Sequence, residues 1–121
     1  MNYERALSML AEALDDPYPV LTVAELDHEL RTSDAAALWV GDRSVVFVRI
    51  RDCENGERIL EAAPAAGDLS EILGRGTVEI EALARQHDCT QIHVQAGREG
   101  WERALKSHGY ETAAVLLRKI L

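Results

Sequence analysis

His87, Cys89 and His93 are the residues closest together in the sequence that have the chemistry of metal ligands. Imidazole and thiolate groups bind zinc when four ligands converge on the ion. The surrounding pattern instead predicts the end of a helix at His87, a turn at Cys89 and a strand that contains His93. Their side chains would then point in different directions, and a site would also need a fourth ligand. We therefore expect no metal site.

The segment from Gly97 to Trp101 is a second group of residues with functional chemistry. Its two glycines flank a charged pair and precede a tryptophan, which predicts a tight turn between a strand and a helix. Arg98 has two alternative roles there. Its guanidinium binds an anion, or it pairs with Glu99 or Glu102. We favour the structural ion pair.

The composition is that of one globular domain with an acidic surface. The chain has 121 residues, of which 47% are hydrophobic and 28% charged, and its net charge is -8. Its cationic residues form no cluster beyond the pairs Arg49 with Arg51 and Arg118 with Lys119, so we expect no nucleic-acid binding. No apolar run has the length of a membrane helix, and no signal peptide is apparent. We expect a cytoplasmic protein without a membrane partner.

The elements that must position these groups follow from the spacing of apolar residues. Residues 3–14 have helical spacing, and a second helix begins at Thr22, which has capping-box spacing to Glu25. Residues 37–40 and 44–50 predict a β-hairpin, and residues 58–63 predict a third antiparallel strand. Pro64 has no N–H to donate to a sheet, so we expect it to end that strand or to lie in a bulge.

The second half of the chain predicts a helical region, a short strand, a helix and a terminal strand. Gly74 and Gly76 interrupt the helical region, which leaves one kinked helix over residues 69–87 or two helices separated by a turn. We expect the turn, with Thr77 capping the second helix. Residues 90–95 then form a strand parallel to the third one, residues 100–108 form a helix that ends before Gly109, and the apolar C-terminus forms a strand.

This order of elements resembles the layout of the GNAT acetyltransferase superfamily. The resemblance is carried by the stretch IEALARQHDCTQIHVQAGREGWERALKSHGY, whose last helix runs into Gly109-Tyr110. The stretch is also similar to small GNAT-like proteins encoded near bacterial prophage genes. The resemblance covers residues 37–121, the part with the sheet and crossover helices, and residues 1–34 form a helical N-terminal part. It implies one α/β domain over residues 1–121 with a mixed, mostly antiparallel sheet flanked by helices.

The resemblance implies a site for acetyl-CoA between two strands that splay apart. The pantetheine arm would pair with the backbone at Ala62 and Ala63, and the pyrophosphate would lie on a glycine loop at a helix N-terminus. The residues of that loop are Gly74, Arg75, Gly76 and Thr77. A second candidate loop, Ala65-Ala66-Gly67-Asp68, is short and also contains an acid. The superfamily pattern begins with Gln or Arg, whereas this chain has Glu71, whose carboxylate would repel a phosphate. Arg75 would offset this repulsion.

The resemblance also suggests catalytic positions. Glu61 is the candidate general base, acting through water, although an outward-facing residue of an alternating strand is the simpler interpretation. The superfamily's tyrosine acid falls here on Leu105, which cannot donate a proton, and the asparagine before the last helix falls on Arg98. We expect Tyr110 and Trp101 to belong to the core.

Two functions follow from the resemblance and its departures. The first is an acyl-CoA-dependent N-acetyltransferase, or a degenerate relative, that uses acetyl-CoA and no metal, with a small-molecule or peptide amine as acceptor. The second is a non-catalytic, phage-related GNAT-fold protein that acts in protein interaction or assembly. In either case the apolar C-terminal strand favours a homodimer, because an exposed strand edge recruits a second chain.

Overall fold

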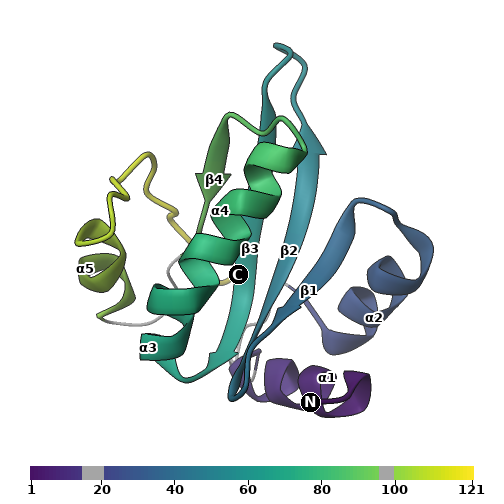
Figure 1. Cartoon of the computed structure of the whole chain (residues 1–121). Helices are drawn as coiled ribbons and strands as arrows, with labels where there is room; N and C mark the ends of the chain where they lie inside the picture. Colours follow the sequence, from purple (N-terminus) through teal and green to yellow (C-terminus); the bar gives the residue numbers. More distant parts are fainter. Residues whose placement is uncertain (15–20, 96–99) are drawn as a thin grey trace.

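The strand Ser44–Asp52 (β2) is the centre of the molecule because it is apolar on both faces. Val45 and Phe47 lie in one apolar cluster, and Val46 and Val48 lie in another on the opposite face. This alternation is the side-chain period of a strand. The computed structural model describes residues 1–14, 21–95 and 100–121, and Figure 1 shows helices on both faces of its sheet.

The sheet has four strands in the order β1-β2-β3-β4. They are β1 (Ala36–Val40), β2, β3 (Arg58–Gly67) and β4 (Gln91–His93). The first three are antiparallel, and β4 is parallel to β3. The predicted hairpin, third strand and parallel pair are therefore confirmed, although β4 is shorter than the predicted strand.

Two helices cover one face of the sheet. They are α1 (Tyr3–Ala13) and α2 (Val23–Thr32). The predicted capping box at the start of α2 is confirmed, because Thr22 and Glu25 exchange side-chain to backbone hydrogen bonds of 3.2 Å. The core on this face consists of Ala6, Leu10, Leu26, Val45, Phe47 and Ala66.

A continuous helical run covers the other face. It consists of α3 (Leu69–Glu71), a π-helical turn η1 (Ile72–Gly76) and α4 (Thr77–Gln86). The turn that we predicted at Gly74 to Gly76 is wrong, and the alternative of one irregular helix is confirmed. The Thr77 N–H bonds to the Ile72 carbonyl, so the chain stays helical there and Thr77 is not an N-cap. The core on this face consists of Trp39, Val46, Val48, Leu60, Ala62, Ile72, Ile80 and Ala84.

β3 continues past Pro64 because the proline lies in a bulge, as predicted. Val48 is opposite Ala62 and Val46 is opposite Ala65, so Phe47 faces two residues of β3, Ala63 and Pro64. The Ala63–Pro64 peptide bond is cis. The missing N–H of proline is tolerated where the ladder is already interrupted.

The C-terminal part differs from the prediction. The helix α5 (Trp101–Lys106) is present, and Gly109 follows it with a φ of 89°, the positive value predicted for a residue after a helix. The predicted terminal strand is wrong, because residues 111–121 form neither helix nor strand and are exposed. The predicted turn around Arg98 lies outside the described residues. None of the helices described has the length and apolarity to span a bilayer.

Candidate cofactor site

β3 and β4 are paired over only a short distance. The parallel ladder joins Ile59–Glu61 to Gln91–His93, and β3 then continues to Gly67 with no described strand on that side. Ala62 and Ala63, the predicted pantetheine positions, lie just beyond the last pair. The β3–β4 pairing therefore ends next to the residues where the resemblance placed acetyl-CoA.

Apolar side chains lie near the end of this ladder. Ala62 is 8% exposed and belongs to the core cluster beneath the helical run. Val94, which follows β4, and Trp101 of α5 are half-buried and pack against the same cluster. Trp101 is thus a core residue, as expected.

The connection from β3 to the helical run is very short. Only Asp68 separates Gly67 from Leu69, so there is no room for a glycine loop before the helix. The Asp68 carboxylate accepts the backbone N–H groups of Ser70 at 2.9 Å and of Glu71 at 3.4 Å. The donors that a helix N-terminus offers to a phosphate are therefore bound to a carboxylate of the chain itself.

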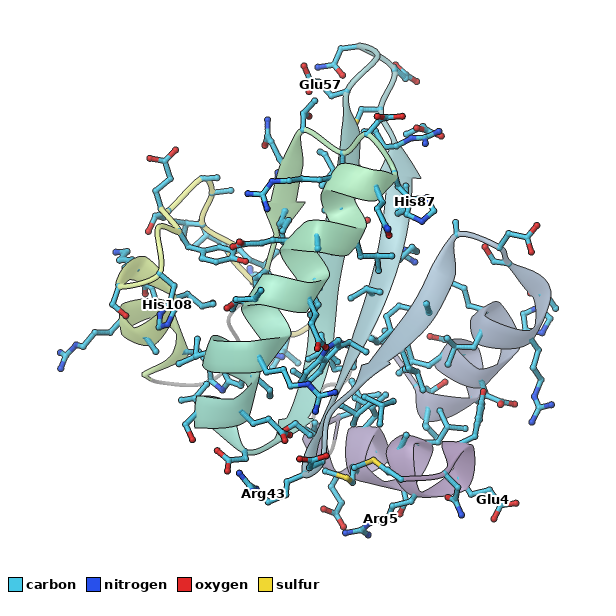
Figure 2. The ribbon with its side chains drawn as sticks, viewed as in Figure 1. Glu4, Arg5, Arg43, Glu57, His87 and His108 are labelled. Carbon is cyan, nitrogen blue, oxygen red and sulfur yellow. The ribbon has the colours of Figure 1, made fainter. Side chains whose placement is uncertain are left out.

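The charge of Asp68 is stabilised at this position. Its pKa lies below the usual value because the Ser70 hydroxyl and the Arg43 guanidinium donate to it, helped by the backbone N–H of Glu71. The Arg43 to Asp68 ion pair measures 2.9 Å, and Figure 2 shows Arg43 at the β1–β2 turn. A negative carboxylate at this point repels an incoming pyrophosphate.

Glu71 ties the same helix start to the β1–β2 turn. Its carboxylate accepts the backbone N–H groups of Asp42 at 2.9 Å and of Arg43 at 3.0 Å. The pKa of Glu71 is lowered by the nearby Ser44 hydroxyl and by these backbone donors. Gly41 is required here, because a Cβ on it would lie 2.5 Å from the Glu71 carboxylate.

The predicted phosphate-loop residues have structural roles within the helix. Gly76 lets the Trp39 ring approach, since a Cβ there would lie 3.3 Å from the ring. Thr77 donates its hydroxyl to the Leu73 carbonyl at 2.5 Å. Gly74 is exposed, and a Cβ on it would meet nothing within 4 Å.

Arg75 is engaged by groups of the chain itself. It pairs with Glu79 at 3.0 Å and lies over the Trp39 ring, 6.0 Å from its centroid. Glu79 also accepts the Trp39 Nε1–H at 2.6 Å, and its pKa is lowered first by that bond and then by Arg75. The guanidinium that was expected to offset the charge of Glu71 thus stabilises the packing of Trp39 on the helix.

Glu61, the candidate base, belongs to a chain of charges on the α2 face of the sheet. Its Oε1 atom is 3.0 Å from Arg51 and 3.6 Å from Arg49, and neither contact has the geometry of a hydrogen bond. Arg49 also pairs with Glu29 of α2 at 3.2 Å. The register places His93 beside Glu61, where it contacts Gln91 at 2.8 Å. The surroundings of Glu61 are those of a structural ion-pair network, and an acceptor amine would have to compete with two guanidinium groups.

The position of the superfamily's catalytic acid is apolar in the structure. Leu105 is 7% exposed. Among the residues described, no group of three or more His, Cys, Asp or Glu is arranged to hold a metal ion.

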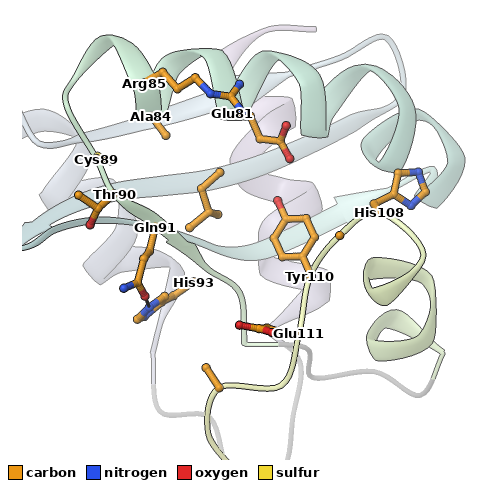
Figure 3. A pocket seen from close by; sticks show the side chains of 13 residues that line it. Glu81, Ala84, Arg85, Cys89, Thr90, Gln91, His93, His108, Tyr110 and Glu111 are labelled. Carbon is orange, nitrogen blue, oxygen red and sulfur yellow. Dashed lines mark hydrogen bonds between the residues drawn. The ribbon is translucent and has the colours of Figure 1, made fainter.

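A cavity of about 330 Å³ lies elsewhere, along the outer edge of β4. Its walls come from α4, β4 and the segment after α5, and they include Glu81, Ala84, Cys89, His93 and Tyr110. Figure 3 shows Tyr110 between α4 and β4, with its hydroxyl directed towards α4. The tyrosine is half-buried in this cavity, and burial and the charge of Glu81 raise its pKa. Sequence reasoning missed this cavity because its walls are brought together only by the fold.

Comparison with known proteins establishes the fold. No protein family and no curated protein matches the sequence. Solved structures do match. A protein from Pyrococcus furiosus assigned as an acetyl transferase has a TM-score of 0.72 at 15% identity over 98% of this chain and 93% of its own. The glucosamine-6-phosphate N-acetyltransferase of Arabidopsis thaliana has a TM-score of 0.67 at 15% identity, over 97% of this chain and 90% of its own. An acetyltransferase of Trypanosoma brucei has a TM-score of 0.65 at 16% identity, over 99% of this chain and 96% of its own. The single domain of this chain, a four-stranded mixed sheet flanked by helices, therefore has the fold of the GNAT acetyltransferases.

Proposed function

We propose that this chain is a GNAT-fold protein without a working coenzyme A phosphate site, and that it acts in protein interaction or assembly. The observation that carries the proposal is the Asp68 cap on the helix that follows β3. Binding of a pyrophosphate there would require the carboxylate to leave its N–H donors, its Ser70 hydroxyl and its Arg43 partner. The fold alone does not require catalysis, because one fold carries many functions.

Two further features support this proposal. The expected acid is replaced by buried Leu105. Glu61 faces two arginines, which is a poor setting for a base that must take a proton from an amine. An association with prophages belongs to the same proposal and rests on the sequence resemblance alone.

An acyl-CoA-dependent N-acetyltransferase is the second candidate, and one observation favours it. The pairing of β3 with β4 ends at Glu61 and His93, so the backbone of Ala62 and Ala63 has no described strand beside it on that side. A pantetheine arm that pairs there would place a thioester near Glu61. In this case the binding and orientation of thioester and amine would supply much of the rate.

Calorimetry separates the two candidates. Acetyl-CoA is titrated into the purified protein, with desulfo-CoA as a ligand that lacks the thioester, and a thermal-shift measurement is made in parallel. The proposal predicts no heat and no change in Tm at ligand concentrations of about 1 mM. Micromolar binding would overturn the proposal and support the acetyltransferase, and an amine screen with Glu61→Gln as the inactive control would follow.

A further inference from the structure

The C-terminal segment exposes an unusual amount of apolar surface. Eight large hydrophobic side chains are exposed among the described residues, and five of them belong to this segment: Val115, Leu116, Leu117, Ile120 and Leu121. Leu117 is 87% exposed, although leucine is among the residues most often buried. Exposed apolar residues gathered in one segment indicate a surface that another protein covers.

The sequence of this segment suits a strand that is covered on both faces. Along Ala113–Leu121, apolar residues occupy both sets of alternating positions, with Arg118 in one set and Lys119 in the other. Near-continuous apolar runs are typical of strands inside a layered α/β sheet. The segment forms no strand within its own chain.

β4 offers an edge to such a strand. It is the last strand in the sheet order, and its ladder with β3 uses only one side. The Thr90 N–H donates to the Arg58 carbonyl at 2.8 Å, on the β3 side. Ile59 and Glu61 direct their backbone groups to β2, so Leu60 is the residue that bonds to β4, and it does so through Gln91 and His93. The N–H of Ile92, between these two, therefore points to the free edge. An unpaired edge of this kind is a template for another chain.

The cavity beside this edge offers both apolar contacts and carboxylates. Its apolar walls include Ala84 and Ile92, and its charged walls include Glu81, Glu111 and Arg85. The chain as a whole has a net charge of -8, whereas its last four residues include Arg118 and Lys119. A basic, apolar strand would therefore bring cations close to the carboxylates of Glu81 and Glu111.

We propose that Ala114–Leu121 of one copy adds as a strand to the free edge of β4 in a second copy, and that the exchange is reciprocal. The residues just before this segment, Tyr110, Glu111 and Ala113, already line the cavity of their own chain without forming a ladder. The eight residues that follow are exposed, and in an extended conformation they reach about 26 Å. A two-fold exchange buries the apolar residues of both copies and leaves neither edge open.

The test is the mass of the full chain in solution, measured by light scattering after size exclusion over a range of concentrations. We expect twice the chain mass of 13.4 kDa. Leu117→Lys should raise the dimer dissociation constant about 100-fold, because two buried leucines are lost per dimer. Val78→Lys is the matched control, since Val78 is 66% exposed on α4, and it should leave the dimer unchanged.

A second variant tests the acceptor edge. Ile92→Pro removes an N–H that faces the free edge, and it should also give a monomer, with circular dichroism used to check the fold. A wild-type monomer at about 100 µM, or a dimer that survives Leu117→Lys or Ile92→Pro, would overturn the proposal. The proposed dimer contact uses the β4 edge and not the Asp68 cap, so the dimer measurement and the acetyl-CoA titration test separate claims.

Discussion

The carboxylate of Asp68 accepts the backbone N–H of Ser70 at 2.9 Å, on the first turn of the helix that follows β3. In this fold the same turn is where an anionic ligand would find free donors and a positive helix end. Here the donor is used by a side chain of the protein, and that side chain is itself negative. The cap both stabilises the helix and closes the position to phosphate.

The cap should contribute measurably to stability. Asp68→Ala removes the acceptor for two backbone N–H groups and the partner of Arg43, so we expect Tm to fall by about 3–6 °C. Thermal unfolding followed by circular dichroism measures this change. Asp34→Ala, at an exposed position outside any helix, is the control and should leave Tm unchanged. An unchanged Tm in the Asp68 variant would show that the cap is not formed.

Stability should decrease in acid, in part through three carboxylates at the start of and within the helical run. The pKa values of Asp68, Glu71 and Glu79 are lowered in the folded protein, the first by Ser70, the second by Ser44 and the third by Trp39. A carboxylate whose pKa is lower in the folded protein stabilises it at any pH above the unfolded pKa, which is near 3.8 for Asp and 4.5 for Glu. This stabilisation is lost as the pH falls through the folded pKa.

Urea unfolding at pH 7 and at acid pH measures this loss. In Glu79→Gln, the free energy of unfolding should fall less between pH 7 and acid pH than it does in the wild type. In Glu54→Gln, in the exposed β2–β3 turn, it should fall as much as in the wild type. An equal fall in the wild type and the Glu79 variant would contradict the role assigned to the Trp39 contact.

Two glycines of the helical run should respond oppositely to alanine. Gly74 has open space around its Cα, so Gly74→Ala should stabilise the protein by about 1 kcal/mol by reducing the freedom of the unfolded chain. Gly76→Ala should lose that gain, because its Cβ would lie 3.3 Å from the Trp39 ring. Denaturant unfolding compares the two variants, and an equal gain in both would show that Trp39 does not pack on Gly76.

The Arg51 to Glu61 pair should act as a modest structural contact. Its atoms are 3.0 Å apart but both side chains are partly exposed, so a double-mutant cycle with Arg51→Met and Glu61→Gln should give a coupling energy below about 1 kcal/mol. The coupling should shrink further in 1 M salt. A coupling of about 3 kcal/mol that persists in salt would indicate a buried pair instead.

Much of the fold follows from local patterns in the sequence. The β-branched and apolar run from Ser44 to Ile50 identifies the central strand, because near-continuous apolar runs are typical of strands covered on both faces. Thr22 and Glu25 mark a helix start through a contact three residues apart, and Pro64 marks a bulge through its missing N–H. These features are local, so the sequence alone is sufficient to predict them.

Other features depend on contacts between distant residues. Gly74 and Gly76 predicted a turn, yet Gly76 is a glycine because Trp39, far away in the sequence, packs on it. The apolar residues 113–121 predicted a strand, but a strand also needs a partner edge, which the sequence does not contain. The Asp68 cap, by contrast, could have been predicted from the sequence. Asp68 lies three positions before Glu71, which is the spacing of an N-terminal cap.

The most direct test of the closed phosphate position is an NMR titration of the labelled protein with acetyl-CoA, observed at the backbone amides of Ser70 and Glu71. The account predicts that both amide signals stay unchanged up to about 1 mM ligand, because their N–H groups remain bound to Asp68. Saturable shifts of these two amides, together with those of Ala62 and Ala63, would contradict it and would show that coenzyme A displaces the Asp68 carboxylate.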